Sequence, residues 1–159
     1  MSAVNANLDS ATSEDRLDFF VVFSSMASVG GNPGQTDYAF ANRFLGSFAA
    51  AREELRIDGR RHGLSRALIW PTWRDGGMEL DEQTRETMRR RLGIAQLTTG
   101  SGLRTFDAAL AGDAAEVGVV VADMEQLSAL LPIERAQETP PSQAQSELAE
   151  LLDELDSGW

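Results

Sequence analysis

The chain has 159 residues, of which 42% are hydrophobic, and this is enough for one hydrophobic core. Its formal net charge of -11 disfavours nucleic acids and anionic membranes as partners, because an acidic surface repels both. Without cysteine, and with His62 as its single histidine, the chain has no disulfide or thiol nucleophile, and we expect no metal site. We find neither an apolar stretch of about 18 residues nor a signal-peptide pattern, so we expect a cytoplasmic location.

An unbroken apolar run at residues 19–23 predicts a strand buried on both faces of a parallel sheet. Ser24 and Ser25 follow the run, at the carboxyl end where such sheets place their chemistry. The glycine- and proline-containing segment 30–34 then predicts a loop. We expect two serine hydroxyls at the edge of the sheet, next to this loop.

A helix is predicted from about residue 36 to residue 56, with Tyr38 and Asn42 one turn apart on one face. A carbonyl reduced by hydride transfer develops negative charge on its oxygen, so its site needs a proton donor and a second hydrogen-bond donor within about 3 Å. The Tyr38 phenol and the Ser25 hydroxyl are groups of these two kinds. Tyr38 alone would more simply be a half-buried structural tyrosine.

The same helix shows an apolar stripe, which predicts that one side of it packs on the core. The stripe consists of Phe40, Phe44, Leu45 and Phe48. The arginines and glutamates from residue 52 onward are expected to lie on a solvated end of the helix.

Residues 64–70 predict the next strand, which Pro71 ends. A charged helix is expected over 81–91, where acidic residues at its start and arginines at its end match the helix dipole. Its terminal arginines are either a solvated helix end, which we favour, or a phosphate site. A further amphipathic helix over 98–110 and a last parallel strand over 117–122 complete the core.

The composition changes after residue 133. Residues 134–141 are typical of a linker, and a capping-box pattern then predicts a short acidic amphipathic helix over 142–159. Such a helix is marginal alone, so it either packs on its own domain or docks on a partner.

The Ser25, Tyr38 and Asn42 pattern and its surroundings resemble the ketoreductase domains of modular polyketide synthases, within the short-chain dehydrogenase/reductase superfamily. The loop 70–78, with the pattern WPxWxxGGM, is similar to that of trans-acyltransferase synthases, although it also has the composition of an ordinary aromatic turn. The resemblance implies that residues 1–133 are the C-terminal part of a Rossmann-like doubly wound α/β domain, with about three parallel strands and covering helices.

The resemblance also implies roles for individual residues and a cofactor. Tyr38 would donate the proton, Ser25 would orient the carbonyl and Asn42 would organise the proton relay. The implied cofactor is NADPH, and the implied substrate is a β-ketoacyl thioester held by an acyl carrier protein. The remaining implied contacts are with the cofactor at Ser24, Pro71 and Thr72, and with the substrate or lid at Trp73 and Met78.

Two features of such reductases are missing. The chain has no glycine-rich turn of the kind that binds a pyrophosphate, and it contains no lysine, since all 14 basic residues are arginine. The resemblance places the catalytic lysine at Met1. Two functions follow as alternatives: a catalytic part that needs an N-terminal half-reductase, or a non-catalytic interaction module in a synthase assembly. Either way, we expect the strand near residues 19–25 to expose a sheet edge.

Overall fold

The computed structural model describes residues 2–31, 34–76 and 81–130 of the chain. The chain divides into two compact units, residues 1–127 and 128–159. Only residues 128–130 of the second unit are described, so the predicted linker and acidic helix lie outside the described residues. No helix among the described residues is both long and apolar enough to cross a membrane.

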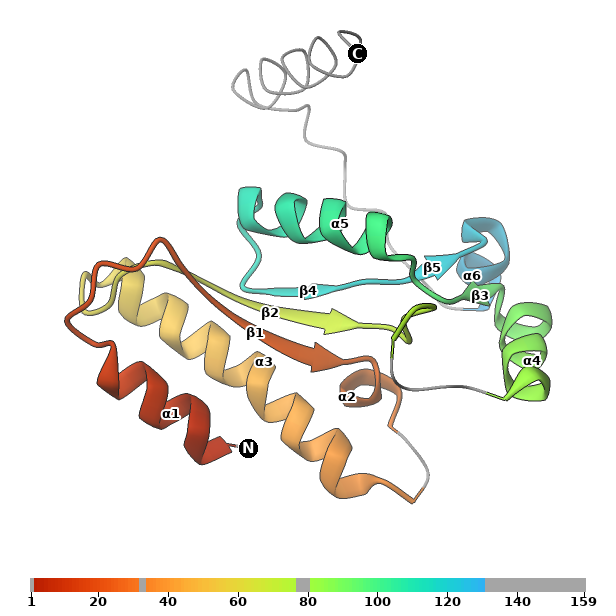
Figure 1. The fold of residues 1–159 in the computed structure, drawn as a ribbon, viewed down its shortest axis with the longest axis horizontal. Coiled ribbons are helices and arrows are strands. Elements are labelled where there is room, and N and C mark those ends of the chain that lie inside the picture. The colour runs from red at the N-terminus through yellow and green to blue at the C-terminus, as the bar shows by residue number, and fades with distance from the viewer. Residues whose placement is uncertain (1, 32–33, 77–80, 131–159) are drawn as a thin grey trace, which may run out of the picture. The chain divides into compact units, whose positions relative to one another are not determined.

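A parallel sheet lies at the centre of the first unit (Figure 1). Its three strands are β1 (Phe19–Ser25), β2 (Leu64–Trp70) and β4 (Glu116–Gly118), in the order β1-β2-β4. Both pairings are parallel, and β1 pairs with β2 along its whole length. β1 is therefore an edge strand of the described sheet, as expected from the sequence. The prediction that it is buried on both faces is wrong, because Phe19 and Phe23 are 49% and 59% exposed on one face.

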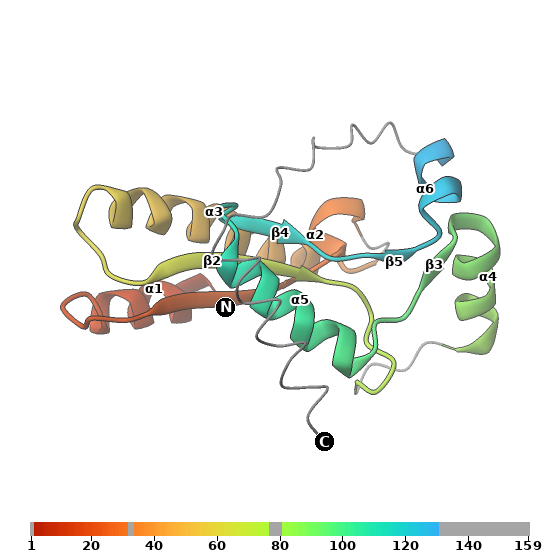
Figure 2. The same cartoon turned by 90° about the horizontal axis from the view of Figure 1, so that it is seen from above.

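Helices lie on both faces of this sheet. α1 (Ser2–Ala11) and α3 (Thr36–Ile57) lie on one face, and α5 (Thr99–Ala111) lies on the other (Figures 1 and 2). The α3 side of the core contains Phe20 and Val22, because side chains alternate along β1. This arrangement confirms the predicted α/β fold with part of a doubly wound sheet.

Five shorter elements complete the described part of the chain. They are α2 (Ala27–Gly30), α4 (Glu82–Leu92), β3 (Ile94–Ala95), β5 (Val121–Ala122) and α6 (Met124–Leu130). The Asp81 carboxylate caps α4 by accepting from the Thr84 N–H at 2.8 Å, and Gly93 ends the helix in the left-handed conformation that glycine favours.

The prediction of one parallel strand over 117–122 is wrong. Only β4 pairs with β2, whereas β5 forms a separate antiparallel pair with β3. Between them Val119 is buried, and its N–H donates to the Ile69 carbonyl at 3.0 Å at the end of the main sheet. After this bond the chain leaves the main sheet, and Val121 and Ala122 pair with β3 instead of β2.

The predicted stripe on α3 is only partly correct. Leu45 is buried and Phe44 and Phe48 are half-buried, but 73% of Phe40 is exposed. Phe40 precedes Leu45 by five residues, which at about 3.6 residues per turn places it on the opposite side of the helix.

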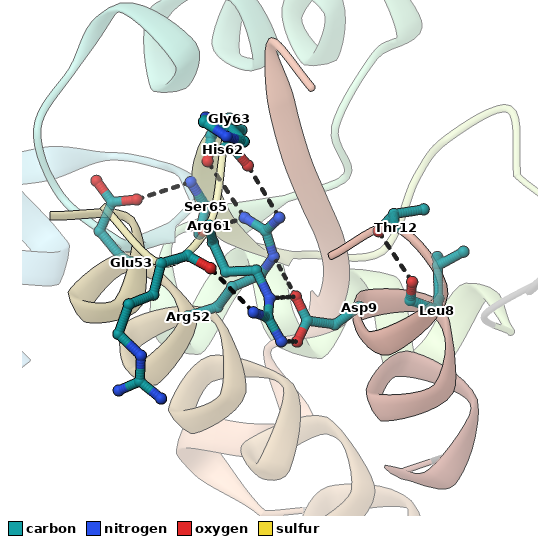
Figure 3. A network of polar contacts seen from close by, with 10 residues as sticks. Leu8, Asp9, Thr12, Arg52, Glu53, Arg61, His62, Gly63 and Ser65 are labelled. Atoms are coloured by element: carbon teal, nitrogen blue, oxygen red, sulfur yellow. Dashed lines mark hydrogen bonds and ion pairs between the residues drawn. The ribbon is translucent and has the colours of Figure 1, made fainter. Parts of the chain in front are cut away.

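The expectation of a solvated end from residue 52 onward is also wrong for its first two residues. Arg52 is 2% exposed and Glu53 is 9% exposed. Arg52 donates to the carboxylate of Asp9 on α1 at 2.8 Å and to Ser65 Oγ on β2, also at 2.8 Å (Figure 3). Buried charges of this kind need close partners, and here the partners come from distant parts of the chain, which the helical pattern does not reveal.

Glu53 completes this ionic network at the amino end of β2. Its carboxylate accepts from the Ser65 N–H at 2.9 Å and from the Arg56 guanidinium at 2.9 Å, and Arg66 lies 3.4 Å away. Burial alone would raise the pKa of the Glu53 carboxyl, but these donors outweigh it and lower the pKa. The network thus fastens α1 and α3 to the central strand.

Candidate functional site

The candidate site lies at the carboxyl ends of β1 and β2, where the two strands end side by side. Ser25 is paired with Trp70, and the N–H of Met26 donates to the Trp70 carbonyl at 3.0 Å. The segments that follow the two strands therefore start together at one edge of the sheet. This is the edge at which open α/β sheets bind ligands.

Ser24 anchors α3 to the sheet. It is buried, and its hydroxyl donates to the backbone carbonyl of Asn42 at 2.9 Å. This bond fixes the position of α3 along the end of β1. It therefore sets the positions of Ser25, next to Ser24 on the strand, and of Tyr38, one helical turn before Asn42. A direct contact of Ser24 with a cofactor remains a prediction.

Ser25, Tyr38 and Asn42 come from the two elements that this bond joins. Ser25 is half-buried, and its Oγ accepts from the Ala27 N–H at 3.3 Å at the start of α2. Tyr38 is half-buried in the first turn of α3, and the Asn42 side-chain amide donates to the Tyr38 carbonyl at 2.9 Å. Asn42 therefore fixes the turn that presents the phenol, and a role in proton relay stays a prediction.

The segment after β2 is fastened by backbone hydrogen bonds. Leu97 N–H donates to the Thr72 carbonyl at 3.0 Å, and Arg74 N–H donates to the Leu97 carbonyl at 2.8 Å. Between them the Trp73 ring packs on Trp70 with centroids 5.0 Å apart and borders the core. The predicted contact of Trp73 with substrate therefore remains a prediction for a residue that already has a packing role. Met78 lies outside the described residues.

A pocket of about 380 Å³ opens beside this segment. Its lining joins Met26 after β1, Pro71, Thr72 and Arg74 after β2, Val120 after β4, and residues of α4 and β3. The lining residues of α4, of β3 and directly after β3 are Glu82, Arg85, Glu86, Met88, Arg89, Ile94, Ala95 and Gln96. Two predicted cofactor residues, Pro71 and Thr72, thus line a real cavity.

Sequence reasoning missed the contribution of α4 to this pocket. Glu82, Arg85, Glu86 and Arg89 recur at three- and four-residue intervals, which is the spacing of one helix face and was the available signal. The arginines are paired within the helix: Arg85 lies 2.7 Å from Glu82 and Arg89 lies 2.7 Å from Glu86.

One carboxylate of α4, that of Glu86, is held in its ionised form. Hydrogen bonds from Arg89 and Arg90 lower the pKa of the Glu86 carboxyl below its ordinary value. Glu86 is thus ionised at neutral pH and cannot donate a proton there. The pocket has an apolar wall, three arginines and two glutamates, and two of the arginines, Arg85 and Arg89, are paired with those glutamates.

Comparisons with known proteins agree with this geometry. Residues 3–75 match the family model described as the KR domain. Among solved structures, a ketoreductase domain from the bacillaene assembly line is 32% identical with a TM-score of 0.75, over 79% of this chain and 30% of that one. The chain belongs to the KR domains of polyketide synthases. A second structure, an N-terminal ketoreductase from the macrolactin assembly line, is 35% identical with a TM-score of 0.65, over 80% of this chain and 23% of that one.

Curated relatives of this KR chain are large synthases. Polyketide synthase PksN of Bacillus subtilis is 31% identical over 150 residues, which are 94% of this chain and 3% of that protein. Polyketide synthase ThaG of Burkholderia thailandensis is 39% identical over 124 residues, which are 78% of this chain and 2% of that protein. The chain spans only a few per cent of these relatives and corresponds to a partial KR domain.

Proposed function

We propose that this KR chain is the serine, tyrosine and asparagine part of a β-ketoreductase, which reduces a carrier-bound β-ketoacyl thioester to the β-hydroxy form. The supporting observation is the hydrogen bond from Ser24 to the Asn42 carbonyl, because it holds the elements that bear Ser25 and Tyr38 together at the carboxyl edge of the sheet. The pocket that reaches Pro71 and Thr72 opens at the same edge.

Each group has a distinct part in this reduction. The Tyr38 phenol donates the proton that the carbonyl oxygen gains, and the Ser25 hydroxyl donates a hydrogen bond that orients the same oxygen. Asn42 holds the turn of α3 that carries Tyr38, through its bond to the Tyr38 carbonyl.

The apolar wall of the pocket supports a site for the neutral nicotinamide end of NADPH, and two of its three arginines are already paired. Pro71 and Thr72 would hold that end, and the bound cofactor would supply the hydride. The chain's sequence contains no glycine-rich turn for the pyrophosphate. An N-terminal half-reductase would supply that site and the missing lysine.

The substrate would arrive on an acyl carrier protein, and the reaction would take place in the cytoplasm. The acidic net charge of -11 supports neither nucleic acid nor an anionic membrane as a partner.

A non-catalytic interaction module is the second candidate. The lack of lysine favours it. The resemblance implies that a lysine lowers the pKa of the tyrosine phenol through its charge, and all 14 basic residues of this chain are arginine. The undisturbed Ser25, Tyr38 and Asn42 pattern favours the enzyme.

The two candidates differ in one assay. The chain is mixed with NADPH and a small β-keto thioester, alone and with the upstream portion of the bacillaene ketoreductase, while the absorbance of reduced nicotinamide is followed. We expect turnover only in the mixture, and a loss of about 10²- to 10⁴-fold for Tyr38→Phe because that variant removes the general acid. Turnover by the chain alone would refute the need for a second part. Its absence from both samples would favour the interaction module.

A further inference from the structure

α4 forms one wall of the pocket, and its carboxyl end is joined to neighbouring elements. The residues of the helix that line the pocket extend from Glu82 in its first turn to Arg89 near its end. After Gly93 the chain continues directly into β3, which pairs with β5. The position of this wall therefore depends on what holds the last turn of α4.

A glutamine of α6 binds that last turn. The Gln126 side-chain amide donates to the backbone carbonyl of Arg90 at 2.9 Å. Arg90 lies among the last residues of α4, where carbonyl groups run out of partners within a helix. Gln126 therefore supplies, from another element, a hydrogen bond that the helix does not provide.

Gly93 shows how closely the two elements approach. It ends α4 with a φ of +66°, and a Cβ at this position would lie 2.9 Å from Gln126 Oε1 and 3.2 Å from Asp123 Cβ. The Asp123 N–H donates to the Gly93 carbonyl at 2.9 Å. Glycine suits this position because it permits both the left-handed conformation and the close approach. The end of α4 thus packs directly on the residues that begin α6.

The first turn of α6 has a fixed position of its own. Asp123 Oδ1 accepts from the Gln126 N–H at 3.1 Å, as an N-cap does. Leu127, next to Gln126, is 5% exposed. Upstream of β5, the Val119 N–H donates to the Ile69 carbonyl of the main sheet at 3.0 Å. Gln126 therefore holds α4 from a segment that is tied to the core.

A small tilt at the carboxyl end would displace the whole wall. Glu82 precedes Arg90 by eight residues, which is about 12 Å along a helix that rises 1.5 Å per residue. A tilt of about 10° around Arg90 would therefore move Glu82 by about 2 Å. A misplacement of about 1 Å is enough to cost about 100-fold in some enzymes. One hydrogen bond at the end of α4 can thus set the width of the pocket.

We propose that Gln126 is a positioning residue, which holds α4 in place and thereby sets the width of the pocket and its affinity for the β-ketoacyl thioester. Gln126 is not among the described residues that line the pocket, so it acts through α4. The inference rests on the proposed function in one respect, that this pocket is where the reduction takes place.

Two substitutions at Gln126 test the hydrogen bond. Gln126→Glu keeps the size of the side chain, but a carboxylate cannot donate to the Arg90 carbonyl and is repelled by the negative end of the helix dipole. Gln126→Lys keeps a donor and places a positive charge at the same end, where lysine side chains bind terminal carbonyls. We expect the first to release α4 and the second to hold it. Both should leave the urea midpoint unchanged, because the bond is exposed.

Thiol labelling measures access to the pocket without any turnover. Thr72→Cys gives this cysteine-free chain a single thiol in the pocket. Adding Gln126→Glu should raise its labelling rate about 2- to 10-fold, the effect of losing one hydrogen bond from the closed form, and adding Gln126→Lys should leave the rate unchanged. The matched control is Ile57→Cys at a 70% exposed position on α3, whose rate should be equal in all three backgrounds.

Enzyme kinetics test the same residue in the mixture with the upstream portion of the bacillaene ketoreductase. Gln126→Glu should raise KM for the β-keto thioester about 2- to 10-fold and leave kcat unchanged, because it weakens binding without removing a group that touches the reacting atoms. If the mixture shows no turnover, the proposed function fails, and the labelling rates of the chain alone still decide the role of Gln126.

Three results would overturn the inference. One is an equal labelling rate of Thr72→Cys with and without Gln126→Glu. Another is equal acceleration by Gln126→Glu and Gln126→Lys, which would show that the donor is irrelevant. The last is a lower urea midpoint for Gln126→Glu, since the residue would then hold the fold rather than one wall of the pocket.

Discussion

Replacing Asp9 by alanine should destabilise the first unit far more than the loss of an ordinary ion pair. The Asp9 carboxylate accepts from Arg52 Nε at 2.8 Å and from two nitrogens of Arg61 at 3.0 and 3.1 Å. It joins α1 to the end of α3 and to the turn before β2 (Figure 3). Its removal leaves the Arg52 guanidinium without a counter-charge.

The structure sets the size of this effect. The Arg52 side chain is only 1% exposed, and removing one partner of a buried pair costs about 3–5 kcal/mol. Arg52 keeps acceptors at the carbonyls of His62 and Gly63 and at Ser65 Oγ, and Arg61 is 23% exposed and can be rehydrated. We therefore expect the lower end of the range, about 3 kcal/mol.

Urea unfolding followed by circular dichroism and tryptophan fluorescence measures this loss. At a slope of about 2 kcal/mol per molar, the midpoint should fall by about 1.5 M. The matched control is Glu82→Ala, which breaks a pair with Arg85 whose side chains are 82% and 45% exposed and should cost less than about 1 kcal/mol. If the two variants lost the same free energy of unfolding, the conclusion that the buried ionic network holds α1 on the domain would be refuted.

Three further predictions concern the stability in acid and two glycines of α5. Acid should weaken the fold. Burial alone would raise the pKa of the Asp9 and Glu53 carboxyls, but the surrounding donors outweigh it and lower both pKa values. The stabilisation by these carboxylates is therefore complete above about pH 4.3 and is lost as the pH falls through the lowered values, so Asp9→Ala should show a smaller dependence of stability on pH in acid titrations. Gly102→Ala should cost about 1–3 kcal/mol in urea unfolding, because its Cβ would lie 2.1 Å from the Trp73 ring; an unchanged midpoint would contradict this packing. Gly100→Ala, on the same helix, meets only a side-chain nitrogen at 3.7 Å and should stabilise by about 0.5–1 kcal/mol.

Local patterns in the sequence were sufficient for the main elements. The apolar run predicts β1, Pro71 marks the end of β2, the charges at the two ends predict α4, and an apolar helical spacing predicts α5. These signals depend on neighbours within one turn or one strand. The position of Ser25 at the carboxyl end of β1 follows from the same local pattern.

Contacts between distant segments could not be predicted in this way. Arg52 has the sequence context of a solvated helix end, and its burial depends on Asp9, 43 residues earlier. The break between β4 and β5 depends likewise on β3, whose two residues show no strand pattern of their own. In the sequence, the only sign that α4 lines the pocket was the helical spacing of its charged residues.

The two ends of β2 contribute to different parts of the molecule, the buried ionic network and the pocket. Ser65 and Arg66 at its amino end belong to the buried ionic network, whereas Pro71 and Thr72, just beyond its carboxyl end, line the pocket. Seven residues of extended chain set the two regions roughly 20 Å apart. Pocket residues can therefore be exchanged by evolution or by an engineer with little effect on the ionic network, so ligand binding at this edge can change while the fold is kept.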